Sequence, residues 1–107
     1  MKFDAMAAAV DWLDAYRAGD IESILKMYRH DAVTRCECNG VNLVGKDDLR
    51  SYWAKRLRDH PAEHLDDIAL CDDVTVISYV THDDVVAAIL EFDASGRIVS
   101  LRCGPMW

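Results

Sequence analysis

Proline and glycine are scarce in this sequence, with two prolines and five glycines among 107 residues. Disordered and collagen-like chains are rich in one or both, so this scarcity argues against both classes. Hydrophobic residues, by contrast, make up 51% of the chain, which is enough to build a core. The length is typical of one domain, and we expect residues 1–107 to form a single one.

Basic residues are also few, because 12 lysines and arginines stand against 19 aspartates and glutamates, for a formal net charge of -7. Nucleic-acid-binding domains usually carry a basic stripe, so we expect no nucleic-acid partner. No apolar run approaches the ~20 residues that cross a bilayer, and we expect no membrane association. Asp11 interrupts the short apolar stretch 7–10, which argues against a signal peptide and favours a cytoplasmic location.

The cysteines lack the spacing of a metal site. Zinc ribbons pair their ligands as C-x2-C, whereas this chain has one C-x-C pair and two isolated cysteines. We therefore expect free thiols that pack as small apolar residues, and neither a metal nor a cofactor. The four residues are Cys36, Cys38, Cys71 and Cys103.

Three helices are predicted from apolar spacing and from capping residues. The first covers residues 3–18, and Gly19 suits a left-handed cap at its C-terminal end. Asp20 can cap a second helix over residues 21–28. A third helix is predicted over residues 46–58.

Alternating apolar residues and turn signals predict six strands, over residues 32–38, 41–44, 63–71, 74–81, 85–92 and 97–104. The expected turns are Asn39-Gly40, Asp72-Asp73, His82-Asp83-Asp84 and Asp93-Ala94-Ser95-Gly96. The order is therefore α-α-β-β-α-β-β-β-β, and the last strands form a meander. This pattern is typical of an α+β layer architecture.

Short motifs in a fixed order carry a resemblance to a known family. They are Trp12, Ala15, Ala18-Gly19-Asp20, Leu25, Tyr28, Asp31-Ala32-Val33, Gly45-Lys46, Leu49, Tyr52-Trp53 and Gly96-Arg97-Ile98-Val99-Ser100-Leu101-Arg102. In this order the chain resembles the SnoaL-like branch of the nuclear transport factor 2-like superfamily. The resemblance implies a cystatin-like cone, in which a curved antiparallel sheet wraps around a long N-terminal helix and encloses an apolar pocket.

The same resemblance argues against ketosteroid isomerase activity. Trp12 stands where the isomerases have their oxyanion-donating tyrosine, and Cys36 stands at the position of the general base. Ala88 stands at the position of the protonated aspartate. Isomerisation needs a base near the substrate and donors to the enolate oxygen, and all three matched positions lack the family's residue.

Ten residues are candidates for lining the pocket: Trp12, Tyr16, Tyr28, Cys36, Trp53, His64, Tyr79, Ala88, Leu101 and Cys103. For each aromatic ring the alternative is that it simply fills the core. Strand alternation also predicts that one acid of Asp66-Asp67 faces inward. We expect a cone that binds a small apolar ligand; the alternative is a lyase, isomerase or cyclase acting on a small hydrophobic substrate in the same cone.

The strands over 74–81 and 85–92 carry apolar residues on both faces. One face of the sheet is covered by helices, so the other would leave a contiguous apolar patch in water. Val86, Ala88, Leu90 and Leu101 are expected on the covered face. The sequence therefore predicts a homodimer through the outer face of the sheet.

Overall fold

The computed structural model describes residues 4–36, 41–59, 61–71, 74–82 and 85–105. The helices are α1 (Ala5–Ala18), α2 (Ile21–Lys26) and α3 (Lys46–Asp59). The strands are β1 (Tyr28–Cys36), β2 (Val41–Val44), β3 (His64–Cys71), β4 (Val74–Val80), β5 (Val85–Phe92) and β6 (Ile98–Pro105). This is the predicted order of helices and strands. The predicted Asn39-Gly40 and Asp72-Asp73 turns, the Asp83-Asp84 pair and Cys38 lie outside the described residues.

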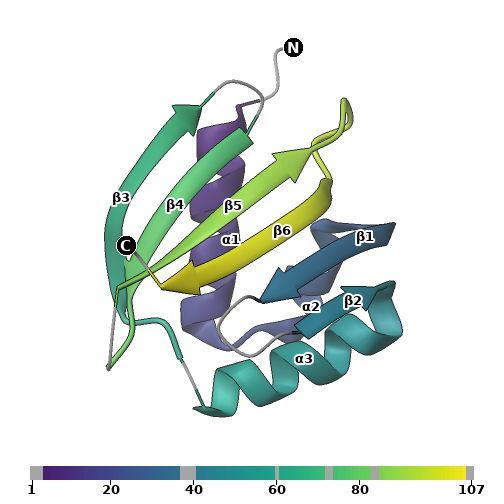
Figure 1. Ribbon diagram of the computed structural model, residues 1–107, viewed down its shortest axis with the longest axis horizontal. Coiled ribbons are helices and arrows are strands. Elements are labelled where there is room, and N and C mark those ends of the chain that lie inside the picture. The colour runs from purple at the N-terminus through teal and green to yellow at the C-terminus, as the bar shows by residue number, and fades with distance from the viewer. Residues whose placement is uncertain (1–3, 37–40, 60, 72–73, 83–84, 106–107) are drawn as a thin grey trace.

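The six strands form one curved sheet in the order β2-β1-β6-β5-β4-β3. Neighbouring strands are antiparallel except β1 and β6, which run parallel because the final meander brings the last strand back beside the first. In Figure 1 the strands lie in front and α1 crosses behind them. The sheet therefore has an inner face covered by helices and an outer face on the opposite side.

Local capping explains where α1 begins and ends. The Asp4 side chain accepts a hydrogen bond from the Ala7 N–H at 3.1 Å, which satisfies one free donor of the first turn. Gly19 then adopts φ 71°, and its N–H donates to the Tyr16 carbonyl at 3.1 Å. Asp20 accepts from the Ser23 N–H at 3.2 Å and so begins α2, as predicted.

The predicted end of the second helix was wrong. The apolar spacing predicted helix to residue 28, whereas α2 ends at Lys26 and β1 already begins at Tyr28. Pairing with β6 ends the helix early. The Ile98 N–H donates to the Met27 carbonyl at 2.8 Å, and Tyr28 of β1 pairs with Ile98 of β6. Tertiary pairing here outweighs local helix propensity.

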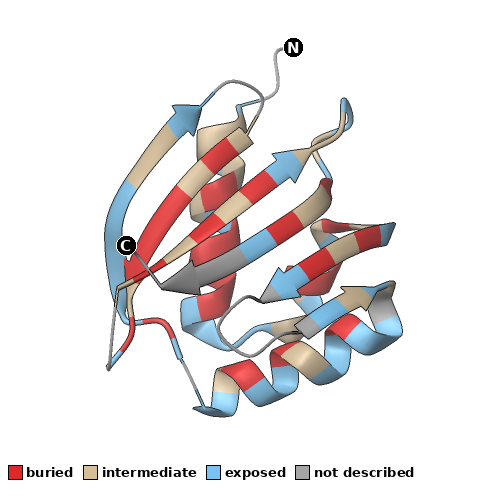
Figure 2. Ribbon diagram, viewed as in Figure 1, coloured by how far each residue is buried: buried red, intermediate tan, exposed pale blue. Residues whose placement is uncertain are grey.

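The predicted register of β5 and β6 is confirmed. Val86, Ala88 and Leu90 are buried on the inner face, and Leu101 is paired with Leu90 and only 1% exposed. Figure 2 shows buried and less buried residues alternating along β5. The side chain of Cys103 lies outside the described part of the structure, although its backbone pairs with Ala88.

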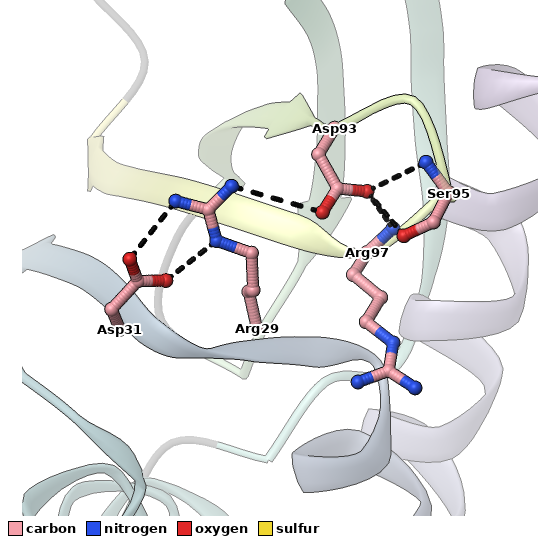
Figure 3. A network of polar contacts seen from close by, with 5 residues as sticks. All are labelled: Arg29, Asp31, Asp93, Ser95 and Arg97. Carbon is pink, nitrogen blue, oxygen red and sulfur yellow. Dashed lines mark hydrogen bonds and ion pairs between the residues drawn. The ribbon is translucent and has the colours of Figure 1, made fainter.

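A polar network at one end of the sheet joins β1 to the turn between β5 and β6 (Figure 3). Oδ1 of Asp93 accepts from the Ser95 N–H at 2.9 Å, the Ser95 hydroxyl at 2.7 Å and the Arg97 N–H at 3.0 Å. Oδ2 of Asp93 lies 3.8 Å from Arg29, which also pairs with Asp31. These hydrogen bonds, chiefly the one from the Arg97 N–H, lower the pKa of Asp93.

Replacing Leu101 by alanine tests the inner face. We expect Leu101→Ala to lower the free energy of unfolding by ~2–5 kcal/mol, because the side chain is fully buried. Val44→Ala is the control, since Val44 is 61% exposed; it should cost less than about 0.5 kcal/mol. Denaturant unfolding measures both. Equal costs for the two variants would contradict the assignment of the inner face.

Asp93→Ala should lower the melting temperature in a pH-dependent way. The pKa of Asp93 in the folded state lies below the ordinary value of 3.8. The carboxylate therefore contributes its full stabilisation above pH 3.8 and loses this contribution as the pH falls through the folded-state pKa. The difference in melting temperature between wild type and variant should therefore be largest near neutral pH and shrink in acid. A difference that stays constant down to acid pH would show that the carboxylate's charge is not involved.

Candidate functional site

Four aromatic rings meet on the inner side of the sheet, and we call them the aromatic cluster: Trp12 and Tyr16 from α1, Trp53 from α3, and Tyr79 from β4. Each is at most 1% exposed. Ring centroids lie 4.8 Å apart for Tyr16 and Trp53 and 5.7 Å apart for Trp12 and Trp53, with edge-to-face geometry. Such pairs add to the stability that burial alone supplies.

The sequence places these rings together in a simple way. Trp12 and Tyr16 are four residues apart and therefore lie on one face of α1. Alternation along β4 turns Tyr79 inward with Thr75 and Ile77, which are also buried. The ring of Tyr79 then lies 5.3 Å from that of Tyr16 and 5.9 Å from that of Trp12.

A buried arginine lies against this cluster. Arg56 of α3 is 6% exposed, and its Nη2 donates to the Tyr79 hydroxyl at 3.0 Å. Its guanidinium carbon lies 5.8 Å from the centroid of the Tyr16 ring, within the range of a cation–π contact. Sequence reasoning did not single out Arg56; the one available signal was its spacing of three residues from Trp53.

Buried polar atoms without a hydrogen-bond partner among the described residues include Nε1 of Trp12, Nε1 of Trp53 and Oγ1 of Thr34. Thr34 lies on β1 with its Cα paired to that of Leu101, and it is 0% exposed. An unsatisfied buried donor or acceptor costs free energy, so atoms of this kind call for an occupant such as water or a ligand.

The remaining predicted site residues divide into two groups. Tyr28, Ala88 and Leu101 are buried in the core with the cluster. Cys36 and Cys103 are backbone partners on β1 and β6, with side chains outside the described part. His64, by contrast, is exposed on the edge strand β3 and is not part of the aromatic cluster.

The prediction that one acid of Asp66-Asp67 faces inward was wrong, because both are exposed. A bulge interrupts the pairing of β3 with β4 between Leu65 and Asp67. As a result Asp66 Oδ2 accepts from the Ser78 hydroxyl at 3.0 Å, and Ser78 is also the backbone partner of Asp67. A bulge sets two residues opposite one, so simple alternation fails at this point.

Several charged groups with shifted pKa values lie at helix caps and in surface ion pairs. The Arg50 guanidinium lowers the pKa of Glu22 through its hydrogen bonds, and the Arg29 guanidinium does the same for Asp31. The Ser23 hydroxyl and N–H lower the pKa of Asp20 at the start of α2. These groups stabilise caps and surface pairs.

The described residues form neither a metal site nor a membrane-spanning helix. Within them, no three histidine, cysteine, aspartate or glutamate side chains gather as a metal site would require. None of the helices they form has the length and apolar character of a membrane span.

The fold is similar to that of two solved bacterial proteins. A SnoaL-like protein of unknown function from Burkholderia thailandensis superposes with a TM-score of 0.85 at 20% identity, over 96% of this chain and 95% of that one. An NTF-2 like protein of unknown function from Burkholderia xenovorans gives a TM-score of 0.74 at 17% identity, over 96% and 85%. No family model and no curated protein matches the sequence. The structural likenesses show the fold alone, and at that level they confirm the cone that the motifs predicted.

Tyr79→Phe tests the buried hydrogen bond from Arg56. Removing the hydroxyl takes an acceptor from a buried cation, so we expect a loss of about 1–3 kcal/mol in the free energy of unfolding. Tyr52→Phe is the control, because Tyr52 is only half-buried on the same helix as Arg56; it should cost less. Adding Arg56→Met to Tyr79→Phe should recover part of the loss, since an apolar pair leaves no donor behind. Equal costs for the two single variants would mean that the hydroxyl is not needed.

Proposed function

We propose that this protein binds a small, largely apolar molecule on the inner side of its sheet, and that the molecule carries an oxygen that accepts a hydrogen bond. The observation that carries the proposal is the pair of buried indole N–H groups, on Trp12 and Trp53, without a partner among the described residues. An indole nitrogen is a donor only, so its natural counterpart is a carbonyl, ether or hydroxyl oxygen.

The surroundings of the two indoles favour the apolar part of such a ligand. The aromatic cluster presents flat carbon surface, and Leu90 and Leu101 on the neighbouring strands are buried on the same side of the sheet. Ligand sites in proteins are mostly apolar with a few placed polar groups that orient the ligand. Arg56 adds positive charge near Tyr79, which also favours an acceptor atom over a donor.

The buried polar residues support binding over catalysis. Those described are Thr34, Arg56, Thr75, Ser78 and Thr81, together with the hydroxyls of the buried Tyr16, Tyr28 and Tyr79, and none of them is a carboxyl or an imidazole group. Proton transfer in a lyase, isomerase or cyclase usually uses such a group within hydrogen-bond reach of the substrate. The composition of this interior therefore supports a binding domain.

A pair of probes with the same shape tests the proposal. Acetylnaphthalene has a carbonyl oxygen, whereas ethylnaphthalene has a methylene group at the same place. We expect calorimetric titration to give tighter binding of the ketone, by about three- to tenfold, the effect of one neutral hydrogen bond. Trp12→Phe or Trp53→Phe keeps a ring but removes the donor, so at least one of them should abolish the preference.

Tyr52→Phe serves as the control for these variants, because it removes a hydroxyl from a half-buried ring and keeps the ring that lies 5.6 Å from that of Trp53. It should leave the preference for the ketone unchanged. The proposal is wrong if neither probe binds, if both bind equally to the wild type, or if the preference persists in both tryptophan variants.

A further inference from the structure

Thr34 combines complete burial with a hydroxyl that has no hydrogen-bond partner among the described residues. It lies on β1 between two apolar cross-strand neighbours, Leu43 of β2 and Leu101 of β6. The row continues through Leu90 to Thr75, so Thr34 shares the inner face with residues that are also buried. A buried hydroxyl without a partner costs free energy, and a valine has nearly the same shape without that cost.

The strand that carries Thr34 packs against the helix that carries Trp53. The Gly45 N–H, just before α3, donates to the Ala32 carbonyl of β1 at 3.2 Å, and α3 then packs against β1 and β2 (Figure 1). Trp53 is 1% exposed on this helix, and its ring lies 5.7 Å from that of Trp12. Thr34 therefore lies on the same side of the sheet as the two indole N–H groups that lack a partner among the described residues.

We propose that Thr34 is a second polar anchor for the ligand, and that the ligand carries a hydroxyl group besides the acceptor oxygen that the indoles bind. This inference rests on the proposed function, because it concerns the same molecule. A threonine hydroxyl both donates and accepts, and a ligand hydroxyl does the same, so the two groups match in either direction. The indole N–H groups only donate, so they select an acceptor such as a carbonyl oxygen.

The side chains around the two anchors are apolar. Leu101 and Leu90 are the buried neighbours of Thr34 along its row, and the aromatic cluster lies on the same side of the sheet. A few polar groups placed in an apolar surface orient a ligand as well as hold it. The ligand class is therefore an apolar molecule that carries oxygen at two places, in its simplest form a hydroxy ketone.

Calorimetric titration with a series of acetylnaphthalenes tests the second anchor in the full chain. Each probe carries either a hydroxyl or a methyl group at one position of the ring remote from the acetyl group. We expect at least one hydroxyl probe to bind the wild type about three- to tenfold more tightly than its methyl counterpart. Thr34→Val should abolish this preference, whereas Thr34→Ser keeps a hydroxyl and should retain it. Thr34→Val should still prefer acetylnaphthalene to ethylnaphthalene, because both indoles are unchanged.

Thr75→Val is the matched control, since Thr75 is buried at the other end of the same row. It lies three strand spacings from Thr34, about 14 Å along the sheet. The same chemical change at this distance should leave the preference for the hydroxyl probe as it is in the wild type.

The protein without ligand offers a second measurement. Thr34→Val should raise the melting temperature by about 4–8 °C, because it removes a buried hydroxyl that has no partner among the described residues. A lower melting temperature would overturn the inference, since the folded chain itself would then satisfy the hydroxyl.

The titrations separate this inference from the proposed function. The inference alone is wrong if the wild type prefers acetylnaphthalene to ethylnaphthalene but prefers no hydroxyl probe to its methyl counterpart. It is also wrong if Thr34→Val keeps the preference for the hydroxyl probe. A wild type that does not distinguish acetylnaphthalene from ethylnaphthalene would overturn the proposed function, and this inference with it.

Discussion

Burial of the aromatic cluster is the interaction on which the rest of the molecule depends. Trp12 and Tyr16 fix which face of α1 meets the sheet, and Trp53 brings α3 to the same place. Tyr79 joins the cluster only if β4 turns the face that carries it inward. The antiparallel register then sets the inward face of β5 and, through β5, that of Leu101 on β6. Large aromatic side chains dominate core energetics, so few other arrangements of these elements are open to the chain.

The same cluster sets the chemistry available inside. The polar groups in and against the cluster are two indole N–H groups, the phenols of Tyr16 and Tyr79, and the guanidinium of Arg56, which donates to the Tyr79 hydroxyl. The indole and guanidinium N–H groups can only donate hydrogen bonds, so they match acceptor oxygens. On the outer face of β4 and β5, valines, an alanine and an isoleucine alternate with the core residues of the same strands.

Local signals in the sequence predict most of the fold. Asp4 and Gly19 limit α1, Asp20 begins α2, and alternation along β5 gives the buried face correctly. The wrong predictions concern residues whose conformation depends on pairing with a strand that is distant in the sequence. Tyr28 is extended because Ile98, far along the chain, pairs with it, and Asp66 turns outward because β3 bulges against Ser78.

The site was less predictable than the fold, for the same reason. The four rings of the cluster were all named from the sequence, but Arg56 was not, because its partner Tyr79 lies 23 residues away on a strand. An arginine on an amphipathic helix ordinarily extends to solvent. Only packing reveals that this one is buried, and only packing reveals which indole nitrogens lack a partner.

The most direct test of the account is NMR of the indole N–H signals, assigned with Trp12→Phe and Trp53→Phe. The account predicts that both signals exchange slowly with solvent and that at least one shifts when acetylnaphthalene is added but not with ethylnaphthalene. Rapid exchange of both, or identical responses to the two probes, would contradict it.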